Sequence, residues 1–283
     1  MVINMELKFC NGNDKAYQAL LNDLLKDIFL DFQFWYDLNL WDENYESYSI
    51  MEDGKIVSNI CVFKTQVLFH GKQSLALSLG AVATREGYRT RGYLKILMEY
   101  ILEKYNKVPM YLGANDSVTQ FYPRFGFQRI NEKLPVAEVN INNLIEPILM
   151  QFDDPQVSDY VYHRTNYSNI LDCVNTQSVN MFHIHFGYLK NSIYHIPELE
   201  TMIIAQQEDH VLRLTGVFSK KEIAFRELIS HLPFQGVSRI EFGFMPYWED
   251  VDYSMQEYET DPIFVRNITC DLGEFKFPEL SIT

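Results

Sequence analysis

Apolar positions in the first part of the chain predict a helix. After a capping residue, Asn13 or Asp14, one apolar face follows the i, i+3, i+4 spacing of an α-helix. Its members are Tyr17, Leu20, Leu21, Leu24, Leu25, Ile28 and Phe29.

Strand-like runs follow this helix. They span Tyr48–Met51, Ile56–Phe69 and Leu75–Thr84. Asp53-Gly54 and His70-Gly71 separate the runs, and two-residue turns of this kind are typical of β-hairpins. We therefore expect an antiparallel meander.

A second amphipathic helix is expected from about Arg91. Its apolar face comprises Leu94, Leu97, Met98, Ile101, Leu102 and Tyr105. The turn Arg89-Thr90-Arg91-Gly92 joins it to the preceding strand. Backbone N–H groups in the first turn of a helix lack partners and lie at the positive end of the helix dipole, and Gly92 lets an anion approach them. This turn is a predicted phosphate site, to which Arg89 and Arg91 add positive charge.

A second motif follows that helix. After a short strand, Val108–Gly113, the chain continues from Asn115 through Tyr122 to Gly126-Phe127. Pro123 removes one helical hydrogen bond, so any helix around Tyr122 should be short or kinked.

The two motifs together resemble the acyl-CoA site of the GNAT superfamily of N-acetyltransferases. In the family motif Gln/Arg-x-x-Gly-x-Gly/Ala, the defined places fall on Arg89, Gly92 and Leu94, and Leu94 is larger than the usual small residue. The second GNAT signature falls on Asn115, Tyr122, Gly126 and Phe127. The resemblance covers about residues 45 to 130. It implies an α/β (α+β) fold with a mixed, mostly antiparallel sheet flanked by helices.

The resemblance also implies roles for individual residues. Tyr122 would be the catalytic general acid that protonates the departing CoA thiolate. Backbone N–H groups around Leu79 to Val82 would hold the thioester oxygen. The expected binding residues for acetyl-CoA, the acyl donor, are Val82, Ala83, Thr84, Arg89, Thr90, Arg91, Gly92, Tyr93, Leu94 and Asn115. The implied reaction is N-acetyl transfer to a primary amine by direct attack.

Each of these residues also has a simpler interpretation. Gly92 could be an ordinary turn residue, Tyr122 a core aromatic, and the arginines solvated charges. The ordered succession of strand, motif, helix, strand and second motif favours the coenzyme site over coincidence. A catalytically silent CoA-binding sensor and a transferase for longer acyl-CoA remain alternatives, although a sensor would not need Tyr122.

The stretch from residue 31 to residue 46 is a dense mixture of aromatic and acidic residues. This mixture would suit a cationic acceptor through cation–π contacts and ion pairs. The acceptor-binding candidates are Trp35, Tyr36, Asp37 and Trp41. The alternative is a helix and loop that bury their aromatic rings against the sheet.

The second half repeats the order strand, strand, helix, strand. The expected elements are Thr201–Gln206, Val211–Phe218, a helix over residues 220–232, and Val237–Phe244. The corresponding strand-to-helix turn, Ser219 to Glu222, contains no glycine. We expect a catalytic domain over residues 1–133 and an α/β domain over 134–283, either a degenerate GNAT repeat or a plain accessory domain, with one CoA site per chain.

Composition restricts the possible partners. A hydrophobic content of 47% is typical of a folded globular protein, and no apolar run is long enough to span a membrane. The net charge of −14 argues against nucleic acid and anionic membranes and permits a cationic acceptor, either a small molecule or a peptide amine. We expect a cytoplasmic protein, with oligomer formation possible. His183-x-His185 is the metal-like spacing among the histidines, but without a third ligand nearby we expect no metal.

The general base is not evident from the sequence. Glu86 and Asp116 lie near the expected cleft. Some multidomain GNAT relatives use a C-terminal carboxylate that threads into the active site, and this chain has the same gross layout. The alternative is that Phe275, Phe277 and Leu280 complete a sheet in the second domain.

Overall fold

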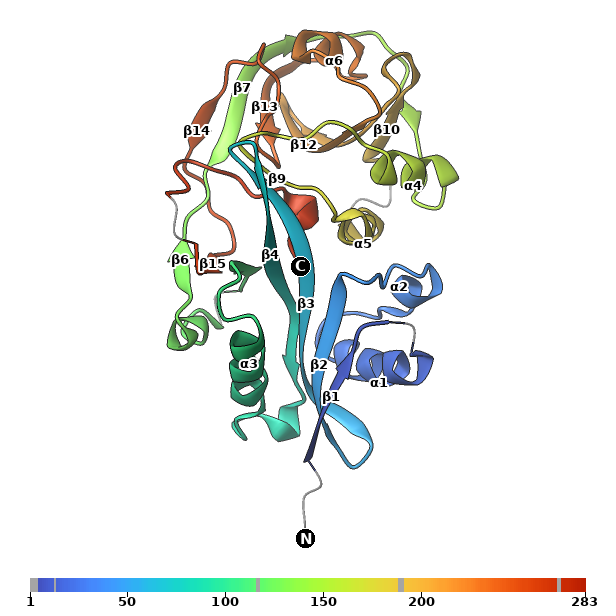
Figure 1. Cartoon of the computed structure of the whole chain (residues 1–283). Helices are drawn as coiled ribbons and strands as arrows, with labels where there is room; N and C mark the ends of the chain where they lie inside the picture. The colour runs from blue at the N-terminus through green and yellow to red at the C-terminus, as the bar shows by residue number, and fades with distance from the viewer. Residues whose placement is uncertain (1–4, 13, 116–117, 188–190, 269–270) are drawn as a thin grey trace.

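The computed structural model describes residues 5–12, 14–115, 118–187, 191–268 and 271–283. In these residues the strands form an eight-stranded and a seven-stranded sheet. The two sheets occupy opposite ends of the molecule, and the C-terminus lies between them beside β3 and β4 (Figure 1). Asn13 and Asp116 lie outside the described residues.

The first sheet contains the predicted meander. Its strands are β1 (Met5–Cys10), β2 (Tyr45–Glu52), β3 (Lys55–Phe69), β4 (Lys72–Thr84), β5 (Met110–Gly113), β6 (Gln128–Ile130), β9 (Leu171–Cys173) and β15 (Ile263–Arg266). The strand order is β1-β2-β3-β4-β5-β15-β6, and β9 pairs with β3. Both predicted hairpin turns are present between β2, β3 and β4. The hydrophobic pattern did not predict the edge strand β1, which is largely exposed and pairs only with β2.

Helices cover both faces of this sheet. The helices α1 (Lys15–Leu25) and α2 (Gln33–Asp37) lie on one side, and α3 (Tyr93–Lys104) lies on the other (Figure 1). The Asp14 carboxylate caps α1 by accepting hydrogen bonds from the N–H groups of residues 16 and 17, as the sequence predicted. The predicted apolar face of α3 is buried at Leu97, Met98 and Ile101.

The second sheet has the predicted order strand, strand, helix, strand. Its strands are β7 (Leu134–Ile141), β8 (Ile148–Leu149), β10 (Ile193–Ile196), β11 (Thr201–Glu208), β12 (Val211–Ser219), β13 (Val237–Phe242) and β14 (Ser254–Gln256). The remaining α-helices of the described chain are α4 (Pro155–Tyr162), α5 (Gln177–Gly187) and α6 (Phe225–His231). The helix expected from residue 220 begins only at Phe225, where the Asp250 carboxylate accepts the N–H groups of Phe225 and Arg226 at 2.9 and 3.1 Å.

Segments from the second half return to the first sheet. Strand β15 pairs with β5 and β6, and β9 pairs with β3. The residues after β15 then run between the sheets, where Phe277 stacks on Tyr111 of β5 with ring centroids 5.0 Å apart. Residues 271–283 contain the short 3-10 helix η5 (Glu279–Ser281) and no strand, so the alternative that Phe275, Phe277 and Leu280 complete a sheet is wrong. The division at residue 133 stays a proposal.

A buried ion pair anchors this C-terminal segment. Lys276 Nζ lies 3.1 Å from Glu132 Oε2, and both side chains are buried. The Glu132 carboxylate also accepts the Phe277 N–H at 2.6 Å. Glu279 in turn accepts a hydrogen bond from Arg213 of β12. The segment is therefore attached to the chain just after β6 through a buried ion pair and to β12 of the second sheet through a partly exposed one.

We expect Lys276→Met to destabilise the protein by about 3–5 kcal/mol, because it leaves the Glu132 carboxylate buried without its cation. Urea denaturation followed by circular dichroism measures this loss. Lys133→Met is the matched control, since Lys133 pairs with the exposed carboxylates of Glu257 and Glu274. Its loss should cost less than about 1 kcal/mol. Equal effects of the two substitutions would contradict an anchoring role for the buried pair.

Candidate active site

The candidate site begins where β4 and β5 separate. Their parallel ladder comprises Leu77 with Met110 and Ser78 with Tyr111, and β5 then pairs with β15 on its other edge. Both strands are described throughout, and the ladder does not continue past Ser78. Beyond Ser78, the edge of β4 that faced β5 therefore borders a gap in the sheet, whereas its other edge stays paired with β3.

A bulge in β4 lies at this gap. Asn59 of β3 pairs with Ala83, and Cys61 pairs with Gly80, so β4 carries one extra residue opposite β3. Ala81 in the bulge has φ of 47°, a left-handed conformation that is unfavourable for a residue with a Cβ. Bulges of this kind redirect backbone groups and are common beside active sites.

A buried polar network holds the bulge in place. The Asn59 side-chain amide donates to the Ala81 carbonyl at 3.1 Å. Its own oxygen accepts hydrogen bonds from the hydroxyl groups of Ser47 and Ser49 at 2.7 and 2.9 Å. Both serines also bond the hydroxyl of Tyr17 on α1. Since all these side chains are buried, the network fixes the position of the strained carbonyl.

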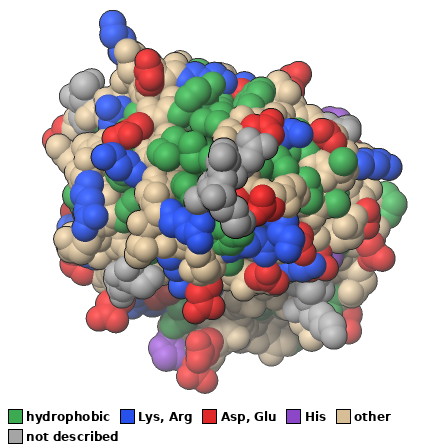
Figure 2. Space-filling view, turned by 90° about the horizontal axis from the view of Figure 1, so that it is seen from below, with side chains coloured by type: hydrophobic (Ala, Val, Ile, Leu, Met, Phe, Trp, Pro, Cys, Tyr) green, Lys and Arg blue, Asp and Glu red, His purple; other side chains and the backbone are tan. Residues whose placement is uncertain are grey.

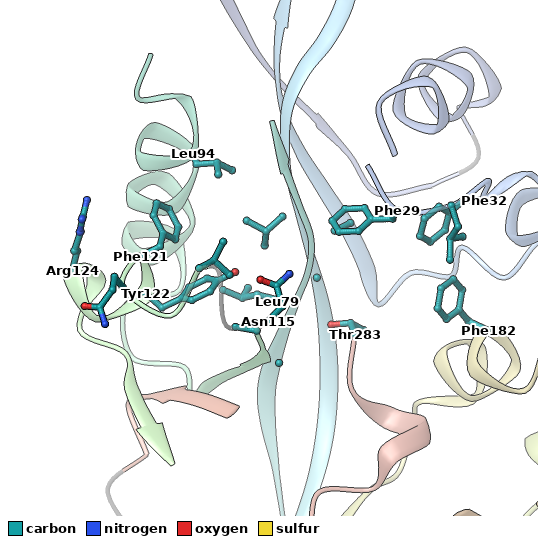
Figure 3. A pocket seen from close by; sticks show the side chains of 18 residues that line it. Phe29, Phe32, Leu79, Leu94, Asn115, Phe121, Tyr122, Arg124, Phe182 and Thr283 are labelled. Carbon is teal, nitrogen blue, oxygen red and sulfur yellow. The ribbon is translucent and has the colours of Figure 1, made fainter. Parts of the chain in front are cut away.

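A cavity of about 590 Å³ passes through the gap. Figure 3 shows that Leu94, Asn115, Phe121, Tyr122 and Arg124 lie on the α3 side, whereas Phe29, Phe32 and Phe182 lie on the other side. Thr283 lies between the two groups. A smaller cavity of about 90 Å³ adjoins it and shares Phe32, Gly80, Ala81, Phe182 and Thr283.

The predicted phosphate turn leads into α3. Gly92 has φ of 83° and precedes the first helical residue without any side-chain cap. Thr90 is also left-handed, with φ of 68°. The first N–H groups of α3 are thus presented to an anion at the positive end of the helix dipole. The structure places the helix start two residues later than the sequence predicted.

The two arginines of this turn have different surroundings. Arg91 Nη1 lies 3.4 Å from a Glu52 carboxylate oxygen, and its guanidinium lies 4.5 Å from the ring centre of Tyr88. Glu52 also accepts a hydrogen bond from Tyr93 of α3. Among the described residues, no carboxylate lies within ion-pair distance of Arg89. We therefore expect Arg89 to contribute more than Arg91 to the binding of an anion.

The predicted coenzyme-binding residues fall into two groups. Those that line the main cavity are Val82, Leu94, Asn115 and the catalytic candidate Tyr122. Those that lie outside its lining are Ala83, Thr84, Arg89, Thr90, Arg91, Gly92 and Tyr93, at the end of β4, in the turn before α3 and at the first residue of α3. This arrangement suits a long ligand with an anionic end at the turn and a reactive end in the gap.

Tyr122 begins η3 (Tyr122–Phe125), a 3-10 helix as short as Pro123 predicted. Its side chain is buried against Phe127 and Phe264. Burial raises the pKa of the Tyr122 hydroxyl to about 12, so the group is protonated at neutral pH and can donate a proton.

The C-terminal residues enter the gap from the opposite direction. The Thr283 hydroxyl lies 2.6 Å from the Ser78 hydroxyl on β4. The His183 side chain of α5 donates a hydrogen bond from Nε2 to the Ile282 carbonyl at 2.6 Å. Gly80 leaves space for this approach, because a Cβ there would lie 2.9 Å from the Thr283 Cβ. His183 thus holds the C-terminal segment, whereas His185 stacks on Phe34 with ring centroids 4.1 Å apart.

The acceptor candidates are mostly distant from the main cavity. Trp35 lines the smaller cavity, but Trp41 is buried and donates its indole N–H to the Tyr45 carbonyl at 2.8 Å. Tyr36 packs on Trp41, and Asp37 is exposed and accepts a hydrogen bond from Gln33. Neither lines the main cavity or the smaller one that adjoins it.

Sequence analysis missed the aromatic residues that do line this side. Phe29 was placed on the apolar face of α1, but the helix ends at Leu25 and Phe29 lies in the following loop. Phe32 belongs to the same loop, and Phe182 comes from α5. No spacing in the sequence links α5 to the first sheet, because they meet only through tertiary packing.

Glu86, one of the base candidates, is not brought into the site. Glu86 is exposed in the 3-10 helix η1 (Glu86–Tyr88) and does not line the cavity. Asp116 lies outside the described residues.

The charged side chains on the face seen from below do not form one large positive surface that would attract an anion. On the face seen from below, acidic and basic side chains are interspersed around a patch of hydrophobic side chains (Figure 2). No helix in the described part of the chain is long and apolar enough to cross a membrane.

Comparison with known proteins agrees with this geometry. Residues 18–130 match the family model described as an acetyltransferase (GNAT) domain. No curated protein sequence matches the chain.

Several solved structures share the fold over both sheets. A probable N-acyltransferase of unknown function from Enterococcus faecalis V583 is 16% identical, with a TM-score of 0.58, and the match covers 93% of this chain and 72% of that one. Eis1 from Mycobacterium abscessus is 13% identical, with a TM-score of 0.58 and coverage of 93% and 73%. A GCN5-related N-acetyltransferase from Kribbella flavida is 11% identical, with a TM-score of 0.55 and coverage of 93% and 71%. The expected GNAT-like α/β fold is confirmed.

Gly92→Glu should weaken coenzyme A binding at least about tenfold in isothermal titration calorimetry. A carboxylate within several ångström of a phosphate is repelled by about 1–4 kcal/mol. Gly92→Ala is the matched control, because both variants place a Cβ on a residue with φ of 83° but only one adds charge. Similar affinities for the two variants would mean that the ligand does not approach this turn.

Proposed function

Residues 18–130 of this chain form a GNAT acetyltransferase domain, and from that premise we propose that the protein transfers an acetyl group from acetyl-CoA to a primary amine. Enzymes of this family transfer acyl groups from acyl-CoA. The acetyl donor and the amine acceptor are the specific parts of the proposal.

The main support is the gap between β4 and β5. A pantetheine arm needs a narrow path lined by backbone groups, and the open edge of β4 beyond Ser78 offers one. The path leads from the turn before α3 to the strained carbonyl of Ala81. On the face of the sheet opposite α3 the same cavity is lined by Phe29, Phe32 and Phe182, and we propose that the acceptor binds on this side.

The residues along this path suit direct transfer. The neutral amine attacks the thioester carbonyl, a tetrahedral oxyanion forms, and the carbon–sulfur bond then breaks. Backbone N–H groups in the bulged part of β4 would stabilise the oxyanion. The thiolate takes a proton from Tyr122, whose hydroxyl is protonated at neutral pH.

Thiol release from acetyl-CoA in the presence of an amine panel tests the proposal. Tyr122→Phe keeps the ring and loses the proton donor, so kcat should fall by about 10²–10⁴-fold while the acetyl-CoA Kd is unchanged. Phe121→Tyr is the control for altered polarity, since it adds a hydroxyl at the adjacent cavity-lining position. Retained kcat in Tyr122→Phe would make Tyr122 a packing residue. Binding of acetyl-CoA without turnover of any amine would favour the sensor alternative.

The general base stays a prediction. In a protein that ends at Thr283, the terminal carboxylate would lie beside Ser78 and the cavity. Two glycines added after Thr283 should then lower kcat about 10²-fold or more at neutral pH and leave acetyl-CoA affinity intact. Activity should recover partly at high pH, where the amine loses its proton unaided. Thr283→Val, which keeps the carboxylate and removes the hydroxyl, should retain activity. Full activity in the extended protein would exclude the carboxylate as base.

A further inference from the structure

The cavity has an apolar wall on the face of the sheet opposite α3. Phe29 and Phe32 come from the loop between α1 and α2, and Phe182 comes from α5. Phe32 and Phe182 stack with ring centroids 5.3 Å apart, and Phe182 meets Trp35 edge-on at 5.8 Å. Figure 3 shows Phe32 and Phe182 close together beyond Thr283 and Phe29 nearer the strands, all three on the side away from Tyr122 and Asn115.

This wall is held in position by its own loop. The buried Asn22 side chain accepts the Phe32 N–H at 2.8 Å and donates to the Asp31 carboxylate at 2.8 Å. The same carboxylate accepts the Gln33 N–H at 2.8 Å. The Asp31 carboxylate next to the wall therefore accepts hydrogen bonds from within the loop and does not line the cavity.

The described lining contains no acidic side chain that would pair with a cation. No Asp or Glu side chain belongs to the described residues that line either cavity, and the charged side chain in the main one is Arg124. A second ammonium group on an acceptor would therefore find no carboxylate side chain among the described residues that line the two cavities. The net charge of −14 can attract cations over a distance, but it supplies no contact at this wall.

An aromatic ring suits the same surface. The edges and faces of Phe29, Phe32 and Phe182 can pack on a flat apolar group in offset or edge-on geometry, which contributes about 0.5–1.5 kcal/mol beyond area burial. The adjoining cavity of about 90 Å³, lined by Trp35, Tyr45 and Val179, extends the apolar space. Phe29 is 49% exposed, and so presents an aromatic surface at the entrance.

We propose that the acceptor is a primary amine carrying an aryl group, which packs on the wall of Phe29, Phe32 and Phe182 while its nitrogen lies at the Ala81 bulge. The assignment of an aryl amine rests on the proposed acetyl transfer and adds the chemical class of the acceptor to it. It narrows the cationic acceptor that the sequence suggested to an amine with a single ammonium group, because no Asp or Glu side chain among the described lining residues could bind a further one.

The first test compares acceptors for the wild-type protein with acetyl-CoA as donor. The probes are 2-phenylethylamine, the alkyl control n-propylamine and the polyamine spermidine. We expect kcat/KM for 2-phenylethylamine to exceed that for each of the others at least about tenfold. A preference for spermidine, or no aryl preference over n-propylamine, would overturn the proposal.

The second test uses variants of the wall. Phe182→Ala should raise KM for 2-phenylethylamine about three- to tenfold and lower the preference for 2-phenylethylamine over n-propylamine by a similar factor, while the acetyl-CoA Kd stays within about twofold of wild type. Phe182→Leu keeps apolar bulk without the ring, so its KM for 2-phenylethylamine should lie between the values of the wild type and of Phe182→Ala. Tyr162→Ala removes an exposed aromatic of α4 outside both cavities and should change nothing. Phe32→Ala repeats the test should Phe182→Ala fail to fold.

A third measurement separates the acceptor from a long acyl chain as occupant of the wall. If the wall binds an acyl chain, octanoyl-CoA will outperform acetyl-CoA, and Phe182→Ala will remove that advantage; this result would overturn the proposal. Failure of the wild-type protein to bind acetyl-CoA would overturn the proposed function itself. Binding and turnover with the wrong acceptor would overturn only the aryl assignment.

Discussion

The site depends on the loss of pairing between β4 and β5 beyond Ser78. A sheet that stayed closed would satisfy its own backbone groups and leave no path for a ligand. Here β5 pairs with β15 on its other edge and leaves β4 beyond Ser78. In that part of β4 lies the bulge, where the Asn59 side chain donates a hydrogen bond to the carbonyl of the strained residue Ala81. Because Asn59 is in turn fixed by Ser47, Ser49 and Tyr17, the first helix and the hairpins support the geometry of the gap.

Both halves of the chain are needed to complete the cavity. Residues from α3 and the segment after β5 form the side on which coenzyme A is proposed to bind, whereas Phe182 of α5 and Thr283 close the other. The buried Lys276–Glu132 pair and the hydrogen bond from His183 hold the C-terminal residues on their path. The second half of the chain therefore supplies part of the cavity lining through α5 and the C-terminal residues. In the same half, the first N–H groups of α6 donate hydrogen bonds to the Asp250 carboxylate.

Local signals predicted most of the first sheet and the coenzyme side of the site. The hairpin turns, the apolar face of α3, the cap at Asp14 and the short helix after Tyr122 all follow from interactions between residues close in sequence. The acceptor side of the site could not be predicted in this way. Trp41 and Tyr36 lie in a stretch whose composition suits a binding surface, but Trp41 is buried in the hydrophobic core and Tyr36 packs against that core. A stretch rich in aromatic and acidic residues does not reveal which side chains become buried.

The sequence by itself determined the elements and the two motifs, because periodicity, capping and turn chemistry act over a few residues. It also carried the Arg-x-x-Gly turn and Tyr122 in their order along the chain. Only the tertiary structure decided that Arg91 is partly neutralised by Glu52, that Phe29, Phe32 and Phe182 form one wall, and that Thr283 lies beside Ser78. These contacts join residues up to 205 positions apart, and their formation depends on how the two sheets pack around the C-terminal segment, which no local pattern records.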